Sequence, residues 1–485
     1  MPKRVPRALG IDVGLTGVRA AVLSADGRLL GTARSVVTPR LSPGRAEGDP
    51  RAWLAAALEA GREAVTQSVD YNHSSEKREG PNSADPPPIY DYNLTKERFA
   101  GAPGVDAIGV AALGSAPILV DADLEPLTPA LLFSLDTRAE EERAGLGVSH
   151  DHALPKLLWW REHEPESWAR AAWALDATGF LVARLTGVAT MDSITRADYD
   201  VRGMAPPLPL PEPLDPLAVA GGLTESAAAA LGLRPGTPVS VGTYDSFADV
   251  AGAGVRRPGE ACVILGSTLI VVRAVEAPVA VEGLALARYP GGGLLVGGWT
   301  ASAGSAIAWF ERELGAPGLN VSALEPGAGG LLALPYLAGE RTPVWDPQAR
   351  GLLLGLTLST TREQAYRAIV DAVALSALDH GKRLEQAGLA PERWLVGGGG
   401  TRHEAWLRAT SDALGAPLAV AAHAGEAICP AVLALRAIGA EPTLEPVRAV
   451  EPDPARHERF ERLYALYRDL HPALADAMHR LGGLE

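Results

Sequence analysis

The sequence predicts an α/β protein built from two large domains, and three observations support this. Its 485 residues exceed what a single hydrophobic core usually supports. Short apolar runs typical of buried strands alternate along the chain with longer Ala- and Leu-rich segments typical of helices. A strand, a turn rich in glycine and threonine, and a second strand occur once in each half, around residues 14–17 and 266–268. We therefore expect two such turns, one in each domain, to bind the phosphates of a nucleotide through backbone N–H groups.

Composition excludes several classes of partner. The formal net charge of −14 argues against nucleic acid and against an anionic membrane surface, both of which require basic patches. A small phosphate-bearing ligand is still compatible, because loops and helix N-termini bind phosphate locally. We find no signal peptide and no run of about 18 apolar residues, so we expect a cytoplasmic protein without a membrane span. Cys262 and Cys429 stand in apolar surroundings and are predicted to be buried, reduced thiols.

The first half begins with strands. Apolar runs at residues 8–13 and 18–23 flank the first turn, and Asp26-Gly27 is a strong hairpin signal. Asp49-Pro50 predicts a helix N-cap followed by a first-turn proline. The other elements predicted here are a helix at 53–65, strands at 105–112 and 118–121, helices at 154–163, 169–185 and 224–231, an irregular proline-rich connection at 204–216, and a strand at 239–241.

Residues 67–99 differ in composition from the rest of the chain. They hold three of its four asparagines and a run of three consecutive prolines. We interpret them as an inserted surface segment, mostly disordered, that carries no chemistry.

The second half has the same kinds of predicted strands, glycine-rich turns and helices as the first. Strands are predicted at residues 262–265, 269–272 and 394–396, and the last of them leads into the tetraglycine at 397–400. Helices are predicted at 302–314, 362–387, 404–414, 430–438 and 454–481. The tetraglycine is typical either of a loop that approaches a ligand closely or of a flexible hinge.

Asp245 is the candidate catalytic residue. It follows a buried strand, opens a segment of small residues, and precedes the second Gly/Thr turn. A carboxylate near phosphate-binding loops is a plausible layout for phosphoryl transfer, in which one group accepts a hydroxyl proton. An aspartate in this position is also typical of a helix N-cap, and the residues alone leave both roles open.

The order of the motifs resembles the FGGY carbohydrate kinases, which include xylulokinases and glycerol kinases. The resemblance spans nearly the whole chain apart from residues 67–99. Its most specific block is Gly-Glu-Arg-Thr-Pro-Val-Trp-Asp-Pro at 339–347. The other landmarks are Ile-Asp-Val-Gly-Leu-Thr-Gly at 11–17, Glu-Gly-Asp-Pro at 47–50, Gly-Thr-Tyr-Asp at 242–245, Gly-Ser-Thr at 266–268, and the tetraglycine.

The resemblance implies two actin-like, or ribonuclease-H-like, domains around a central cleft. It assigns residues 1–253 to a sugar-binding N-terminal domain and 254–485 to an ATP-binding C-terminal domain. It also implies that ATP and Mg²⁺ are the cofactors, with Asp12 orienting the metal through water; a turn-capping role for Asp12 is the alternative. The residues expected to bind the nucleotide are Asp12, Gly14, Thr16, Gly266, Ser267, Thr268, Gly304, Gly398 and Gly399.

By the same resemblance, Asp245 looks like the general base that takes the proton of the attacking hydroxyl. The implied substrate is a small sugar or sugar alcohol, with a ketopentose such as xylulose first. Residues expected to contact it are Ser115, Asp136, Asp245 and Ser246. Xylulokinases have Gln-Met-His-Gly where this chain has Leu-Gly-Ser-Ala at 113–116, and Trp-Asn-Asp-x-Arg where it has Phe-Ser-Leu-Asp-Thr-Arg at 133–138. These departures leave other ketopentoses, sugar alcohols and larger sugars open.

Two other functions compete with an ATP-dependent sugar kinase. One is a catalytically silent protein of the same fold that binds sugar or nucleotide and regulates. The other is a different actin-like ATPase, such as a chaperone, in which the block at 339–347 is not expected. The oligomeric state stays open, with a homodimer as the candidate.

Overall fold

A computed structural model describes residues 4–75, 104–148, 152–201, 204, 206–315, 319–424 and 427–484. The chain forms two compact units. The first comprises Met1–Ala248 and Ala427–Thr443, and the second comprises Asp249–Glu426 and Leu444–Glu485. The chain passes from the first unit to the second within helix α7 (Asp245–Gly252).

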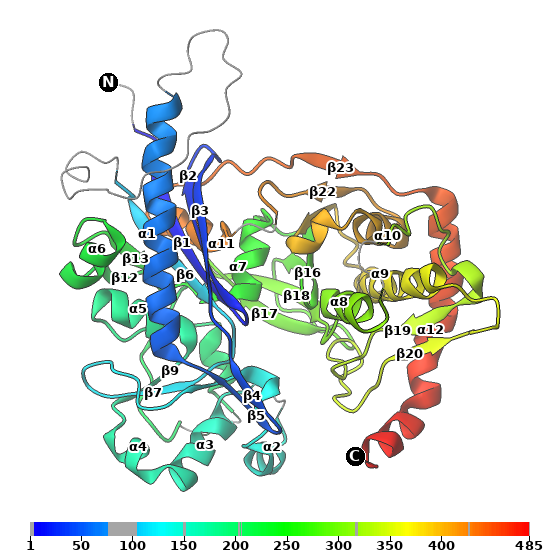
Figure 1. Ribbon diagram of the computed structural model, residues 1–485, viewed down its shortest axis with the longest axis horizontal. Coiled ribbons are helices and arrows are strands. Elements are labelled where there is room, and N and C mark those ends of the chain that lie inside the picture. Colours follow the sequence, from blue (N-terminus) through cyan, green and yellow to red (C-terminus); the bar gives the residue numbers. More distant parts are fainter. Residues whose placement is uncertain are drawn as a thin grey trace. The chain divides into compact units, whose positions relative to one another are not determined.

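The first unit is organised around a seven-stranded sheet (Figure 1). Its strands are β1 (Arg7–Gly14), β2 (Gly17–Ser24), β3 (Leu29–Val36), β6 (Ala107–Ala112), β12 (Val219–Gly222), β13 (Pro238–Ser240) and β14 (Thr243–Tyr244). Strands β1, β2 and β3 form an antiparallel meander, as the Asp26-Gly27 hairpin signal predicts. Strand β6 runs parallel to β1, and β13 and β14 both run parallel to β6.

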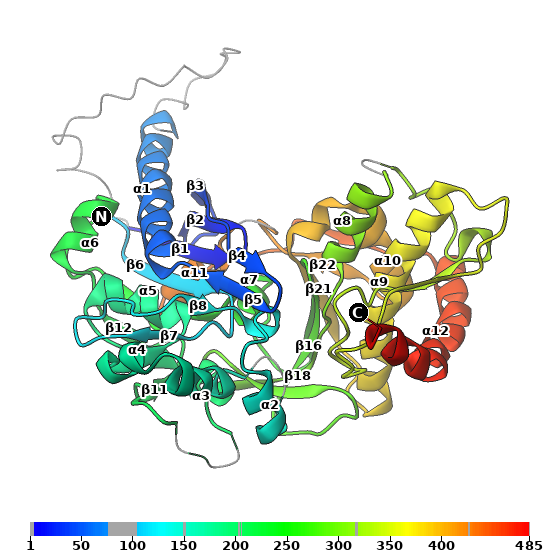
Figure 2. The ribbon, with the colours of Figure 1, turned by 60° about the horizontal axis from the view of Figure 1, so that its bottom comes forward.

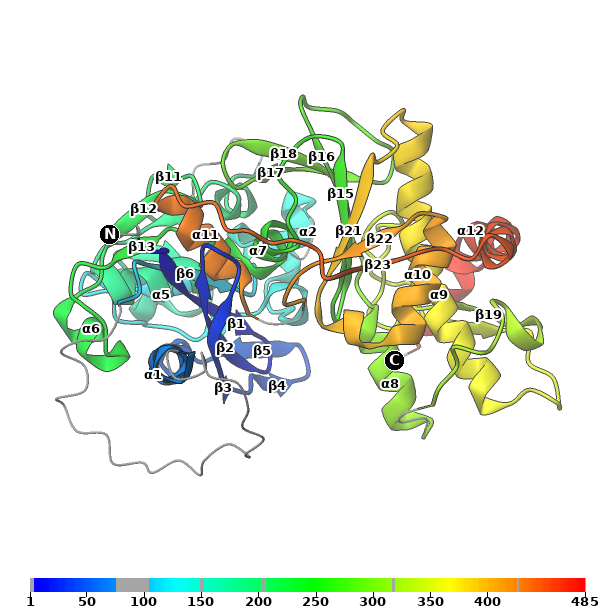
Figure 3. The same cartoon turned by 90° about the horizontal axis from the view of Figure 1, so that it is seen from above.

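Helices cover both faces of this sheet because its buried residues alternate in direction. Leu9 and Ile11 face helix α1 (Pro50–Ser75), where the side chains approach Gly61. Gly10 faces helix α11 (Cys429–Ala437), whose backbone lies so close that a Cβ on Gly10 would stand 2.5 Å from the Ala431 nitrogen. Figure 3 shows α1 and α11 on opposite sides of β1 and β2. Helix α11 thus completes the first unit, although its place in the sequence assigned it to the C-terminal half.

Smaller elements surround the main sheet of the first unit. They are strands β4 (Arg40–Ser42), β5 (Arg45–Gly48), β7 (Ile118–Val120), β8 (Ala130–Leu131), β9 (Trp173–Leu175), β10 (Met191–Asp192) and β11 (Pro213–Leu214), 3₁₀ turns η2 (Phe133–Leu135) and η3 (Thr195–Asp198), and helices α2 (Glu140–Leu146), α3 (Leu154–His163), α4 (Pro165–Arg170), α5 (Ala177–Thr186) and α6 (Glu225–Leu231).

Two predictions for this unit are wrong in part. The single helix predicted at 169–185 is the end of α4, then β9, then α5, because β9 pairs with β7 and Asp176 caps α5. Helix α1 continues to Ser75, so residues 67–75 are helical and not part of a disordered insertion. The rest of that predicted insertion lies outside the described residues.

The second unit repeats the sheet order of the first. Its strands are β15 (Glu260–Leu265), β16 (Leu269–Val275), β17 (Ala285–Tyr289), β18 (Gly293–Trp299), β21 (Arg393–Gly397), β22 (Leu418–Val420) and β23 (Arg448–Val450). Strands β15, β16 and β18 lie side by side and antiparallel, and β21 and β22 continue in parallel from β15. Strands β1, β2, β3, β6 and β13 have the same order and directions, so both units have the actin-like topology, and the predicted fold class is confirmed.

Helices and loops complete the second unit. Helices α8 (Gly304–Glu313), α9 (Arg362–Gln386), α10 (Glu404–Leu414) and α12 (Pro454–Gly482) accompany its sheet, with strands β19 (Leu332–Leu334) and β20 (Leu352–Leu354) and 3₁₀ turns η4 (Ala328–Gly330) and η5 (Gly399–Arg402). Figure 2 shows α9, α10 and α12 packed side by side, and a capping box of Thr361 and Gln364 begins α9.

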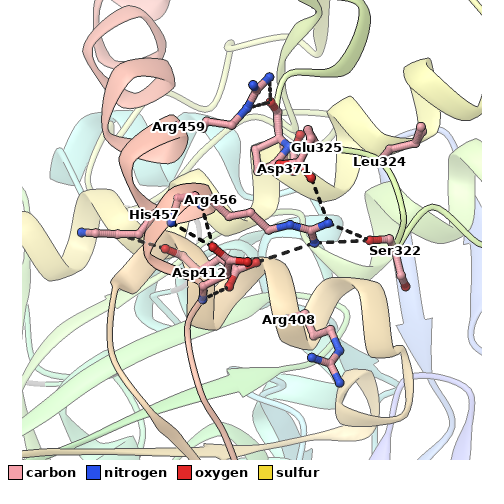
Figure 4. Close-up of polar contacts among 12 residues, drawn as sticks. Ser322, Leu324, Glu325, Asp371, Arg408, Asp412, Arg456, His457 and Arg459 are labelled. Atoms are coloured by element: carbon pink, nitrogen blue, oxygen red, sulfur yellow. Dashed lines mark hydrogen bonds and ion pairs between the residues drawn. The ribbon is translucent and has the colours of Figure 1, made fainter.

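Polar contacts fasten α12 to its neighbours (Figure 4). Arg456 contacts the Ser322 carbonyl, Glu325 and Asp412, and the His457 ring contacts the Asp412 carbonyl at 3.0 Å.

Among the described residues no helix is long and apolar enough to cross a membrane. Cys262 is buried as predicted, but Cys429 is partly exposed, so the prediction of two buried thiols is wrong for Cys429.

Candidate active site

The carboxyl ends of three parallel strands carry the predicted chemistry of the first unit. Asp12 on β1 and Thr243 on β14 are both in register with Ala111 on β6, which lies between these strands. Asp245 follows β14 directly. Two strand spacings separate β1 from β14, so the backbones at Asp12 and at the end of β14 stand roughly 10 Å apart. The sheet therefore brings both predicted carboxylates to one edge.

Asp12 is nearly buried, at 5% exposure, and forms an ion pair with Arg19. Burial raises the pKa of the Asp12 carboxyl, and Arg19 opposes this shift. Its Oδ1 atom is buried without a hydrogen-bond partner in the described part of the chain. An orphaned carboxylate oxygen fits a role in holding a hydrated cation.

The described residues contain no group of three or more His, Cys, Asp or Glu side chains able to hold a metal ion. A Mg²⁺ site does not require such a group, because proteins usually bind this ion through one or two carboxylates together with water and substrate phosphates.

The first predicted phosphate loop is the tight turn between β1 and β2. Gly14 pairs with Gly17 across the turn, and Thr16 is exposed at its tip. The loop thus follows Asp12 within a few residues at the same edge of the sheet.

Asp245 is the first residue of α7 and is partly exposed. Its Oδ1 accepts a hydrogen bond from the Ser246 backbone N–H at 2.7 Å. The carboxylate therefore contacts the helix N-terminus while remaining partly accessible to solvent. This arrangement is compatible with both roles that the sequence left open, the base and the helix cap.

The predicted sugar-contacting residues differ in how accessible they are. Ser246 is partly exposed next to Asp245, whereas Ser115 is 1% exposed and its carbonyl accepts from the Phe133 N–H at 2.7 Å. The Asp136 side chain is fully buried, and its oxygens accept hydrogen bonds from the Arg138 guanidinium and the Ala46 N–H. Asp136 therefore supports Arg138, and its contact with a substrate stays a prediction.

Arg138 is a residue that the sequence reasoning did not place in the site. Its Nη2 atom forms ion pairs with Asp136 at 2.7 Å and with Glu47 at 2.9 Å, and its guanidinium lies over the Trp159 ring. The available signal was the arginine two positions after an aspartate in the xylulokinase-like run. Lys156 contacts the same run of residues: it is buried, and its Nζ donates to the Phe133 carbonyl at 2.7 Å.

The predicted nucleotide-binding residues of the second unit converge around the end of β15. The Gly304 N–H donates to the Gly266 carbonyl at 3.1 Å, and the Ser305 N–H donates to the Ser267 carbonyl at 3.0 Å. A Cβ on Gly304 would stand 2.5 Å from that Gly266 oxygen, so only glycine allows this approach. The turn at 266–268 is therefore locked onto the first residues of α8.

The tetraglycine meets the same strand end. Gly398 has φ 87° and ψ 166°, and a Cβ there would stand 2.6 Å from the Leu265 carbonyl oxygen. Gly399 is exposed beside it and begins the turn η5. These close contacts argue against a flexible hinge, because a hinge needs room to move, and the ligand-facing role of the loop stays a prediction.

The specific block at 339–347 contacts the segment that leads into α8. Glu340 is buried and accepts hydrogen bonds from the Ala301 and Arg341 N–H groups, each at 2.7 Å. Burial raises the pKa of Glu340 to about 8, although both N–H groups oppose the shift. Thr342 contacts the buried His380 ring at 3.0 Å. The block thus braces the segment that leads into α8.

Comparisons with known proteins find similar sequences and structures. Residues 261–438 match the C-terminal domain of the FGGY family of carbohydrate kinases. The xylulose kinase of Staphylococcus epidermidis is 25% identical, with 95% of each protein covered. The glycerol kinase of Alkalilimnicola ehrlichii is 29% identical, with 98% of each covered. The crystal structure of xylulose kinase from Rhodospirillum rubrum has a TM-score of 0.78 at 25% identity and covers 98% of this chain and 100% of that one.

Two actin-like units, each with a Gly/Thr loop at the end of a central strand, and these full-length relatives define an enzyme that transfers phosphoryl groups to carbohydrates. The chain contains the C-terminal domain of the FGGY family of carbohydrate kinases, a family that uses ATP as the phosphoryl donor.

Proposed function

We propose that this enzyme phosphorylates a small sugar or sugar alcohol, with a ketopentose such as xylulose as the first candidate. The substrate class is supported by the xylulose kinases among its relatives, although the chain lacks their Gln-Met-His-Gly segment. The observation that carries the proposal is the common edge of β1, β6 and β14, where Asp12 and Asp245 stand at the ends of the two strands that flank β6.

In the proposed reaction, Asp245 accepts the proton of the attacking hydroxyl while that oxygen meets the terminal phosphoryl group of ATP in line. The partial exposure of Asp245 supports this role, because a substrate hydroxyl has to reach the carboxylate. Ser115, Ser246 and the Asp136–Arg138 pair are the proposed sugar contacts in the N-terminal domain.

The C-terminal domain holds ATP in this proposal. Gly266, Ser267 and Thr268 contact its phosphates together with Gly14 and Thr16, and Gly304, Gly398 and Gly399 line the nucleotide. Asp12 would hold a hydrated Mg²⁺, and this ion would supply positive charge to neutralise the phosphate oxygens. The cytoplasmic location and a homodimer stay predictions.

Substitution of Asp245 tests the catalytic role. We expect Asp245→Asn to lower kcat by about 10²- to 10⁴-fold, the usual contribution of a general base, and to leave ATP affinity within about twofold. Asp249→Asn, one turn further along α7, is the matched control and should retain turnover. ADP release is measured against a panel of ketopentoses, polyols and hexuloses. Near-normal turnover by Asp245→Asn would refute the base assignment.

The same panel separates the kinase from a silent binding protein. Calorimetric titration that detects sugar binding by the unaltered protein, with no ADP release on any sugar that binds, would favour the regulatory alternative.

A further inference from the structure

Strand β14, which leads into Asp245, is only two residues long and is held by its pairing with β6 and by its own side chains. Thr243 Oγ1 donates to Asp192 Oδ1 at 3.0 Å, and Tyr244 OH donates to Asp198 Oδ2 at 2.9 Å. Both acceptors lie in one short segment of the chain. The position of Asp245 therefore depends on where residues 192–198 are held.

Residues 192–198 are themselves firmly anchored. Asp192 Oδ1 also accepts from the Ile194 and Thr195 N–H groups, each at 3.0 Å, which closes the turn η3. The Asp198 carbonyl accepts from the Ala153 N–H at 2.9 Å, next to the start of α3. We call residues 192–198 the anchoring segment.

Tyr244 also touches the loop that carries Ser115. A Cβ on Gly114 would stand 2.0 to 2.5 Å from three carbons of the Tyr244 ring, so the ring lies directly against the Gly114 backbone. Tyr244 itself is 7% exposed. One side chain thus contacts the anchoring segment through its hydroxyl and the Gly114–Ser115 backbone through its ring, while its own backbone leads into Asp245.

We propose that Tyr244 is a positioning residue for the sugar. Its hydroxyl donates to Asp198 and its ring packs against Gly114, and these two contacts set the distance between the Ser115 loop and Asp245. The inference rests on the proposed function, since it assumes that these two features face the sugar. A positioning role of this kind acts on the sugar and not on ATP, because Tyr244, Asp198 and Gly114 all belong to the unit that is proposed to bind the sugar.

A second tyrosine offers a matched control. Tyr199 follows the anchoring segment, is fully buried, and has a hydroxyl without a hydrogen-bond partner among the described residues. Tyr244→Phe and Tyr199→Phe remove the same atom from neighbouring buried sites, but only the first removes a hydrogen bond to a carboxylate. We expect Tyr244→Phe to lower kcat/KM for the sugar about tenfold or more and to leave the KM for ATP within twofold. Tyr199→Phe should leave both unchanged.

Substitution of the acceptor separates positioning from general damage. Asp198→Ala should reproduce the sugar defect, and Tyr244→Phe combined with Asp198→Ala should be no worse than either alone, because the two variants break one interaction. Asp198→Asn keeps an acceptor oxygen and should restore most of the activity lost in Asp198→Ala. Melting temperatures confirm that each variant is folded.

Three results would overturn the inference: equal sugar kinetics for Tyr244→Phe and Tyr199→Phe, an equal loss of ATP affinity, or additive effects of the Tyr244 and Asp198 variants. If the unaltered protein turns over a sugar and any of these results is seen, the inference fails while the proposed function stands. If the unaltered protein turns over no sugar of the panel, both fail.

Discussion

Substitution of Gly398 tests whether the tetraglycine loop packs against β15 and approaches the nucleotide. Its φ of 87° and ψ of 166° lie in a region that is essentially restricted to glycine, where another residue costs about 1–3 kcal/mol. A Cβ at this position would also stand 2.6, 2.9 and 3.0 Å from the Leu265 oxygen, carbon and nitrogen. Because these are backbone atoms of β15, they cannot rotate out of the way. Gly398→Ala therefore requires the strand end to shift, which costs about another 1–3 kcal/mol.

Gly388 separates the steric effect from the backbone effect. It also has a positive φ, of 74°, but a Cβ there would meet nothing within 4 Å. Gly388→Ala should cost only about 1–2 kcal/mol, the price of the left-handed conformation for an ordinary residue. The midpoints of these two ranges differ by about 2.5 kcal/mol, which lowers the melting temperature of a domain of about 150–250 residues by roughly 5–10 °C.

Calorimetry on both variants measures this difference, and initial rates at varied ATP measure the functional effect. We expect Gly398→Ala to melt below Gly388→Ala and to raise the KM for ATP, with the KM for the sugar nearly unchanged. Equal melting temperatures together with an unchanged KM for ATP would show that Gly398 neither packs against β15 nor approaches the nucleotide.

Two further predictions concern stability. Burial, with the neighbouring Asp192, raises the pKa of Asp176 to about 7, so the folded protein binds an extra proton between about pH 4 and 7 and loses stability as pH rises through this window. Asp176→Asn should remove that loss and raise stability at pH 8 by on the order of 1–4 kcal/mol, with little change at pH 4; an equal change in melting temperature at both pH values would contradict this. Asp371→Ala should cost about 3–5 kcal/mol, because it leaves the buried Arg367 cation without its partner at 2.7 Å. Asp476→Ala, at an exposed ion pair, is the control, and similar melting temperatures for the two would show that the buried pair contributes little.

Much of the fold was predictable from local patterns. The hairpin at Asp26-Gly27, the helix start at Pro50 and the bounds of α3, α9 and α10 follow from turn residues, caps and helical periodicity. Strand β9 was not predictable, because its three residues are extended only through pairing with β7 in a region that otherwise has helical composition. The membership of α11 in the first unit depends on close approach to Gly10, which no local pattern reports.

The sequence by itself determined which residues are candidates, because the order of its glycine and aspartate motifs needs no knowledge of their contacts. Only the tertiary structure decided how these residues are used. It puts Asp12 and the end of β14 in register across β6, and it closes the Gly266 turn onto Gly304. It also brings Arg138 into hydrogen-bond contact with Asp136, and Tyr244 into hydrogen-bond contact with Asp198. The physical reason is that strand register and side-chain hydrogen bonds join residues far apart in the chain, whereas sequence patterns report mainly on neighbours.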